Sequence, residues 1–270
     1  GDADGTLWRL DLSSSEPNDW NVQLAFDAYP RTTDGFDDGQ PISTTPVVSV
    51  DGLGNTVLLF TTGDQEDFTS DSIRGRAWSI TEFPELVGSG SNAANYRIEA
   101  NWVLGDAQVN GEFGPGEKVT GPIALFDGVA YFSTFTPPDT TAGTCEVGQG
   151  RVWGVDFLTP DEGTTGPRPL PRLPNSTGGF DLFEDLGTNG VPLGVAVTAE
   201  PSCTEEATVS DDFVGQHSTI TQSVPPVYKL RYQSGTQGTR EVGSNTNVGS
   251  ITLPPPRSST IIDSWASVVE

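Results

Sequence analysis

The chain has 270 residues, of which 37 are acidic and 13 are basic, so its formal net charge is −24 at pH 7. Affinity for nucleic acid comes mainly from Lys and Arg that displace counterions, so this charge argues against nucleic acid and anionic lipid as ligands. No run of about 18 apolar residues is present, and we expect no membrane span. Such acidity indicates either a salty or extracellular environment or a basic partner.

Short β-strands joined by turns are expected along the whole chain, because 32 Gly and 21 Pro are spread throughout it. In chain order we predict strands near residues 5–12, 21–27, 45–50, 56–62, 75–81, 101–104, 118–126, 129–136, 150–157, 191–198, 217–223, 226–232 and 259–265. Residues 180–186 (FDLFEDL) are the best candidate for a short helix, and the proline-rich residues 161–179 are expected to be irregular.

One phrase occurs three times: GTLWRLDL at residues 5–12, GRAWSITE at 75–82 and GRVWGVDF at 150–157. The copies begin about 70 and about 75 residues apart, and similar strand phrases with an Asp-Gly turn precede the last two. Repetition at this scale indicates an array of similar units. Three or four short antiparallel strands in each unit are typical of the blades of a β-propeller.

The repeats therefore predict an all-β fold, a partial β-propeller of roughly three to four blades. A closed propeller needs at least four blades. We expect residues 1–270 to form the C-terminal part of one propeller domain of a longer protein, with long loop insertions near 84–100, 159–190 and 233–250. The apolar run 261–269 is a candidate closing strand.

The tryptophans of the repeated phrase are Trp8, Trp78 and Trp153. Their equivalent places in a repeat predict that they pack between blades. The alternative is a platform of aromatic rings for sugar binding.

A loop rich in carboxylates follows the predicted strand 56–62. It contains Asp64, Glu66, Asp67 and Asp71 within eight residues. Calcium takes six to eight oxygen ligands from such flexible loops, so these four residues are a candidate calcium site. The turn Gly and the final Glu of an EF-hand loop are missing, and a solvated acidic loop is the alternative. A second and weaker acidic candidate lies at residues 34–38.

Only two cysteines are present, Cys145 and Cys203, and both lie in polar, turn-rich stretches where a buried free thiol is not expected. We predict a disulfide between them, which indicates an oxidising compartment. The alternative is two unrelated surface thiols. Neither cysteine has neighbours at the spacing of zinc ligands.

No catalytic motif is found, and we predict that the protein is not an enzyme. The single histidine, His217, begins a predicted strand without the spacing of a catalytic triad, so a structural role is expected. The triplet 175–177 (NST) fits a glycosylation site, which is a weak signal.

The order of phrases from residue 1 resembles the C-terminal β-propeller of the PilC/PilY family, which comprises type IV pilus assembly proteins and pilus-tip adhesins. The first family phrase falls on residues 1–12, the second on residues 40–46 and the third on residues 62–71. The residues that match these three phrases are Gly1, Asp2, Gly5, Leu7, Trp8, Arg9, Asp11, Leu12, Gln40, Pro41, Ile42, Pro46, Thr62, Gly63 and Asp71. A later stretch that ends in GRVWGVDF resembles a later blade of the family, where Cys145, Gly148 and Gly150 match. Thr6 stands where the family usually has Asn, and the Tyr after its Thr-Gly is absent.

The resemblance implies a non-enzymatic, extracellular protein at the pilus tip. There it would dock on minor pilins and support pilus extension and surface attachment, with calcium as a modulator. Two alternatives remain. A quinoprotein dehydrogenase also has a propeller with "DGxLxALD" blades, and a carbohydrate-binding propeller would have no connection with pili.

Overall fold

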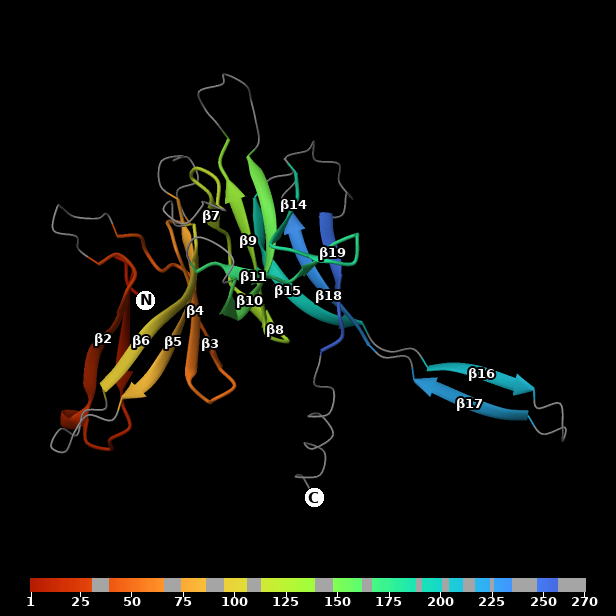
Figure 1. The fold of residues 1–270 in the computed structure, drawn as a ribbon, viewed down its shortest axis with the longest axis horizontal. Helices are drawn as coiled ribbons and strands as arrows, with labels where there is room; N and C mark the ends of the chain where they lie inside the picture. Colours follow the sequence, from red (N-terminus) through yellow and green to blue (C-terminus); the bar gives the residue numbers. More distant parts are fainter. Residues whose placement is uncertain are drawn as a thin grey trace.

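Antiparallel β-sheets account for the regular structure of the described chain (Figure 1). The computed structural model describes residues 1–30, 39–65, 74–85, 95–105, 113–138, 148–161, 167–187, 191–200, 204–210, 217–223, 226–234 and 247–256. Within these ranges there is no α-helix, and one 3-10 turn occurs at Pro17–Asp19. The predicted all-β class is confirmed.

Four sheets carry most of the strands. The first sheet pairs β1 (Thr6–Asp11) with β2 (Asn21–Asp27), and the second has the order β3 (Val47–Val50), β4 (Thr56–Thr62), β5 (Arg76–Glu85), β6 (Asn95–Leu104). The third sheet contains β7 (Lys118–Val119), β8 (Ala124–Phe126), β9 (Val129–Thr136), β10 (Gln149–Pro160), β11 (Pro169–Pro171) and β14 (Phe183–Asp185). The fourth has the order β15 (Pro192–Glu200), β18 (Val227–Ser234), β19 (Asn247–Leu253).

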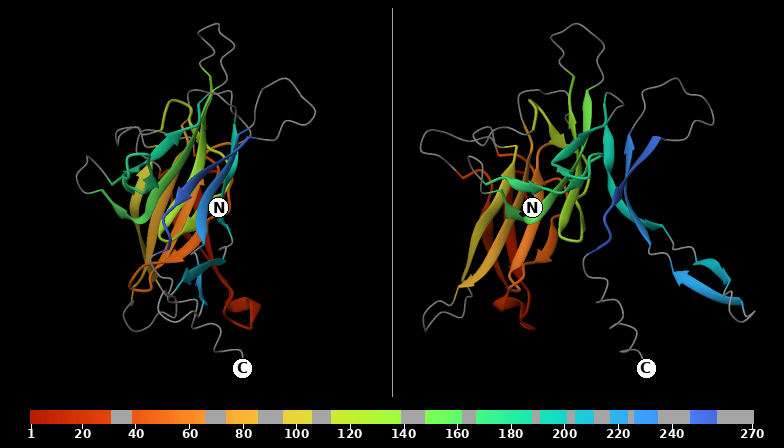
Figure 2. Two further views of the ribbon diagram at one scale, coloured as in Figure 1. Left: turned by 90° about the vertical axis from the view of Figure 1, so that its right-hand side faces the viewer. Right: turned by 45° about the vertical axis from the view of Figure 1, so that its right-hand side comes forward.

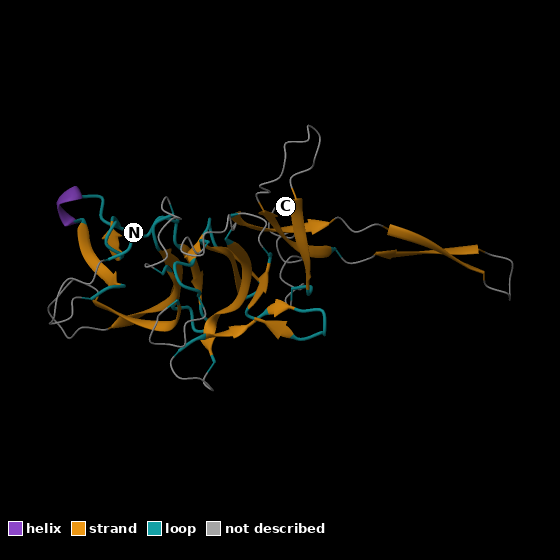
Figure 3. Ribbon diagram, turned by 90° about the horizontal axis from the view of Figure 1, so that it is seen from above, coloured by secondary structure: helices purple, strands orange, loops and turns teal. Residues whose placement is uncertain are grey.

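Two smaller pairs complete the described structure. Strands β12 (Leu173–Pro174) and β13 (Phe180–Asp181) pair beside the third sheet. Strands β16 (Thr204–Ser210) and β17 (His217–Ser223) form a hairpin that extends away from the sheets, as the view from above makes clear (Figure 3).

The four sheets follow one another side by side in chain order (Figures 1 and 2). Successive side chains of a strand point to opposite faces of its sheet. An inner sheet can therefore pack on the preceding sheet with one face and on the following sheet with the other. In β4, Val57 and Leu59 join a buried cluster shared with the third sheet, whereas Phe60 joins a cluster shared with the first. In β9, Phe132 faces the second sheet and Tyr131 packs with Leu230 of the fourth. The inner sheets are therefore apolar on both faces.

The repeated tryptophans Trp78 and Trp153 occupy matching positions in two neighbouring sheets. Trp78 lies opposite Phe60 in the register of β4 and β5, and Trp153 lies opposite Phe132 in the register of β9 and β10. Both pairs are stacked, with ring centroids 6.0 and 5.9 Å apart and interplanar angles of 3° and 6°. Each pair faces the sheet that precedes it in the chain. For these two copies, the prediction that the tryptophans pack between sheets is confirmed.

The first copy differs. Trp8 lies opposite Leu24 in the register of β1 and β2, yet its side chain is 48% exposed. The prediction of buried packing is therefore wrong for Trp8, because no sheet among the described residues covers this face of β1 and β2.

Several other boundaries differ from the sequence predictions. Strand β6 begins well before residue 101, β19 occupies part of a range expected to be a loop insertion, and the predicted strand 118–126 is broken between β7 and β8. The expected short helix at 180–186 is wrong, because its residues form β13 and β14, and Phe183 of β14 pairs with Trp153. The candidate closing strand 261–269 lies outside the described residues.

Candidate functional site

The acidic loop follows β4 at the boundary between the second and third sheets. Asp64 is exposed, whereas Glu66, Asp67 and Asp71 lie outside the described residues, so the candidate calcium site stays a prediction. Among the residues that the structure does describe, no group of three or more His, Cys, Asp or Glu could hold a metal ion.

The start of this loop is anchored by neighbouring backbone. The Gly63 N–H donates to the Pro41 carbonyl at 2.9 Å, and the Gln65 amide donates to the Val119 carbonyl at 3.1 Å. Close by, the Gln40 amide donates to the Arg74 carbonyl at 2.7 Å. Gln40, Pro41 and Gly63 belong to the phrases that resemble the pilus family. The structure thus brings the second and third phrases together at one end of the second sheet.

Cationic side chains lie at the base of the same loop. Lys118, one of only two lysines in the chain, is 2% exposed, and its side chain approaches Gly63. Arg74 donates from Nε to the Gly114 carbonyl at 3.1 Å. A cation beside an acidic loop offsets part of the repulsion between carboxylates.

Glu117 is fully buried, and sequence reasoning missed it. Its carboxylate accepts hydrogen bonds from the Gly114 N–H, from the Thr134 hydroxyl and, at 2.8 Å, from Arg151. The Trp153 indole N–H donates to the same Thr134 hydroxyl at 2.8 Å. A buried carboxylate requires such compensation. The network therefore fixes the side chain of Trp153. No residue near Glu117 in the sequence indicates that this carboxylate is buried.

Arg151 and Arg172 extend this pattern of structural ion pairs. Arg151 also contacts Asp185 at 2.8 Å, and its guanidinium lies 4.5 Å from the centre of the Phe183 ring. Arg172 binds Asp156 through two nitrogens, at 3.2 and 2.9 Å. Paired and hydrogen-bonded groups of this kind position strands.

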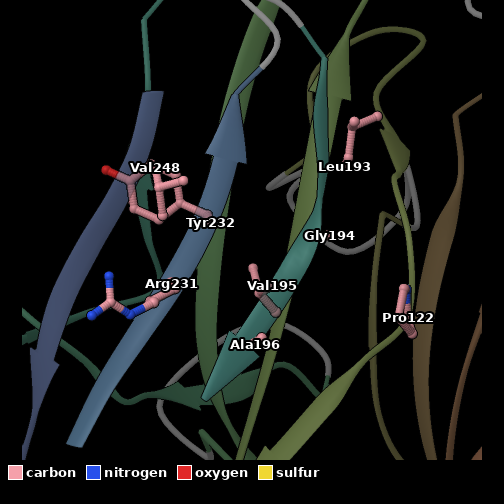
Figure 4. Close-up of a pocket in the computed structure, with 8 residues that line it drawn as sticks. All are labelled: Pro122, Leu193, Gly194, Val195, Ala196, Arg231, Tyr232 and Val248. Carbon is pink, nitrogen blue, oxygen red and sulfur yellow. The ribbon is translucent and has the colours of Figure 1, made fainter. Parts of the chain in front are cut away.

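One cavity lies at the edge between the third and fourth sheets, with a volume of about 280 Å³ (Figure 4). Its walls come from β15, β18, β19 and the segment before β8, and its lining residues are Pro122, Leu193, Gly194, Val195, Ala196, Arg231, Tyr232 and Val248. Arg231 is held by the Thr198 hydroxyl at 3.1 Å and by Glu200 at 3.2 Å. The cavity is large enough for one side chain of a partner protein.

Two glycines shape this edge. Gly121 and Gly194 have φ angles of +97° and +106°, in the left-handed region that favours glycine. A Cβ atom on Gly121 would lie 2.9 Å from the Gly194 Cα, so a side chain there would force the two segments apart.

A smaller polar cavity of about 220 Å³ lies between the first and second sheets. Arg9 Nη1 lies 2.9 Å from Glu82 Oε1 without hydrogen-bond alignment, and the Arg9 guanidinium is 3.3 Å from the centre of the Tyr96 ring. These contacts join the two sheets, and the Glu82 carboxylate neutralises the charge of Arg9 in the cavity.

The remaining sequence candidates are not brought into one site. Cys145, Cys203 and the acidic residues 34–38 lie outside the described residues, and of His217 only the backbone in β17 is described. Asn175 lies in a turn between β12 and β13, where its side-chain oxygen accepts hydrogen bonds from Thr177 and Gly179.

Comparison with known proteins gives no further identification. No protein-family model, curated protein or solved structure matches the chain. In the part of the chain that the structure describes, no helix is long and apolar enough to cross a membrane.

Proposed function

We propose that this chain is a non-enzymatic binding scaffold whose sheets are blades of a β-propeller. The observation that carries the proposal is the stacked Trp–Phe pair, which recurs in the same register in two successive sheets and faces the preceding sheet each time. Radially repeated antiparallel sheets that pack face to face are the building plan of propellers.

The buried charged side chains are paired with one another inside the fold, which supports a scaffold role. Glu117 and Asp156, at the interfaces between strands, are neutralised by Arg151 and Arg172. Catalytic acids and bases must reach a substrate proton. These two carboxylates are instead enclosed by hydrogen bonds, and they stabilise the packing of the repeats.

The resemblance to PilC/PilY proteins supplies the proposed setting. The protein is secreted and sits at the tip of a type IV pilus, where it docks on minor pilins and supports pilus extension and attachment. The loops at the end of the second and third sheets, including the acidic loop, are the proposed place of calcium modulation. The joining of the two family phrases around Gln40, Pro41 and Gly63 supports this assignment.

Immunogold electron microscopy of the organism that encodes the chain tests this setting. We expect label at pilus tips and, after deletion of the gene, fewer pili and less attachment, both restored by the wild-type gene. The deletion strain controls for the specificity of the antibody. Label that is absent from the pili of a normally piliated strain would contradict the proposal.

A further inference from the structure

The turn between β12 and β13 has an anchored base and an open tip. At the base, Leu173 of β12 is 1% exposed and packs in the same buried cluster as Tyr131 and Leu230. At the tip, residues 176–180 are exposed, and a Cβ atom built on Gly178 would have no neighbouring atom within 4 Å. The turn therefore presents its residues from a fixed position, with free space around them.

This turn contains the triplet Asn-Ser-Thr at residues 175–177. The chain has 11 asparagines, and Asn175 alone is followed at the second position by Ser or Thr with no Pro between them. That spacing is the one that glycosyltransferases acting on asparagine require. A triplet enclosed in a sheet could not be modified after folding, whereas this triplet lies in an exposed turn.

The two polar atoms of the Asn175 side chain have different surroundings. The oxygen Oδ1 accepts hydrogen bonds from the Thr177 N–H at 3.1 Å, from the Thr177 hydroxyl at 2.8 Å and from the Gly179 N–H at 2.8 Å. Within the described part of the chain, no residue accepts a hydrogen bond from Nδ2. The turn thus uses only the oxygen of this amide and leaves its nitrogen for another bond.

The three donors around Oδ1 also favour reaction at the nitrogen. An amide nitrogen is a poor nucleophile because its lone pair is delocalised toward the oxygen. When Nδ2 loses a proton, negative charge develops on Oδ1, and donors already placed there stabilise that charge. Thr177 supplies two of the three donors, which gives a physical reason for a Thr two residues after the asparagine.

We propose that Asn175 is a site of N-linked glycosylation. The co-reactant is a sugar activated at its anomeric carbon by a phosphate or diphosphate group, and a glycosyltransferase brings it to the turn. The nitrogen Nδ2 attacks the anomeric carbon, so that a C–N bond forms while the C–O bond to the phosphate breaks. The phosphate leaves with the bonding electron pair, and the Nδ2 proton passes to a base of the transferase. The proposal concerns this turn alone and does not depend on the pilus setting.

Substitutions separate glycosylation from a purely structural role of the turn. Asn175→Asp keeps an oxygen acceptor in the same place, so the turn keeps its hydrogen bonds, but Asp has no amide nitrogen. Thr177→Val keeps the shape of the side chain and removes its hydroxyl. The matched control is Thr177→Ser, which keeps the hydroxyl that the triplet requires.

Peptide mass spectrometry of the protein purified from the organism that encodes it tests the proposal. Cleavage after Arg172 and Glu184 releases residues 173–184 as one peptide. In the wild type and in Thr177→Ser, we expect this peptide to be heavier than its sequence by the mass of whole sugar residues. Electron-transfer fragmentation should place the added mass on Asn175. Asn175→Asp and Thr177→Val should give the peptide without added sugar.

Circular dichroism and thermal melting of the variants confirm that they fold. An unmodified peptide from the wild-type protein would overturn the proposal. Sugar that remains on the peptide in Asn175→Asp would overturn it as well, because the sugar would then be attached to a hydroxyl of Ser176 or Thr177. If a variant does not accumulate, fragmentation of the wild-type peptide decides the question without it.

Discussion

The Trp78 indole lies parallel to the Phe60 ring directly across two paired strands, with an interplanar angle of 3°. Cross-strand aromatic pairs are among the more stabilising contacts of antiparallel sheets. In the next sheet, Trp153 and Phe132 repeat the relationship. The sequence phrase that contains these tryptophans is thus the signature of one packing unit used more than once.

Removing Arg151 should destabilise the third sheet. Arg151→Met leaves the carboxylate of Glu117 buried without its cation, and breaking a buried pair in this way costs about 3 kcal/mol or more of unfolding free energy. Urea unfolding followed by circular dichroism measures the change. The matched control is Arg97→Met, because Arg97 pairs with Glu99 on the surface and both side chains are about half exposed.

The control should lose no more than about 1 kcal/mol, as surface ion pairs do. Equal losses in the two variants would show that the Glu117 network does not hold the sheet.

Tyr131 makes the fold sensitive to high pH. Burial, with a smaller contribution from the charge of Asp127, raises the pKa of Tyr131 to about 12. The folded pKa lies above the unfolded value of about 10. The stabilisation is therefore complete below about pH 10 and is lost as the pH rises toward about 12.

Ultraviolet titration of tyrosinate should show a tyrosine that ionises near pH 12 and that disappears in Tyr131→Phe, whereas the late ionisation of Tyr232, whose pKa burial also raises, should remain. If every tyrosine of the folded protein titrated near pH 10, with the circular dichroism unchanged, burial of this hydroxyl would be refuted.

The calcium prediction is tested by isothermal titration calorimetry. We expect binding in the range of extracellular calcium modules, roughly 10⁻⁴–10⁻³ M. Asp64→Ala combined with Asp67→Ala should abolish it. Asp11→Ala combined with Glu16→Ala removes the same charge from the first hairpin and should leave it intact. If the intact protein bound no calcium, the prediction of a calcium site would be wrong.

The predicted disulfide between Cys145 and Cys203 should stabilise the fold. In the loop-entropy model, closing a loop of this length stabilises a protein by about 4 kcal/mol. Reduction should therefore lower the melting temperature, and mass spectrometry of unreduced peptides should find the two cysteines linked. A melting temperature that reduction leaves unchanged would contradict the pairing.

Local sequence patterns predicted the strands best where those strands alternate strongly or are bounded by turns. The ranges 21–27, 56–62 and 129–136 coincide with β2, β4 and β9. The strands in residues 180–186 were not predicted because their apolar spacing also fits a short helix, and only the pairing of β13 with β12 and of β14 with β10 selects the strands. Tertiary context decides such short segments.

The sites show a different limit of sequence reasoning. Glu117 looks like any other acid of a strongly acidic chain, and its burial depends on Thr134 and Arg151, which are distant in sequence. The exposure of Trp8 likewise depends on which neighbour its sheet has, and the repeated phrase is the same in either case.

The central claim is that the repeated tryptophan is a packing residue wherever a preceding sheet covers it. It is tested most directly by the unfolding free energies of Trp8→Ala, Trp78→Ala and Trp153→Ala, measured in urea. We expect losses of about 3–5 kcal/mol for Trp78 and Trp153, the range for large aromatic side chains removed from a core. We expect about 1 kcal/mol or less for Trp8, since it lies on an exposed strand face. Equal losses at all three positions would contradict the claim.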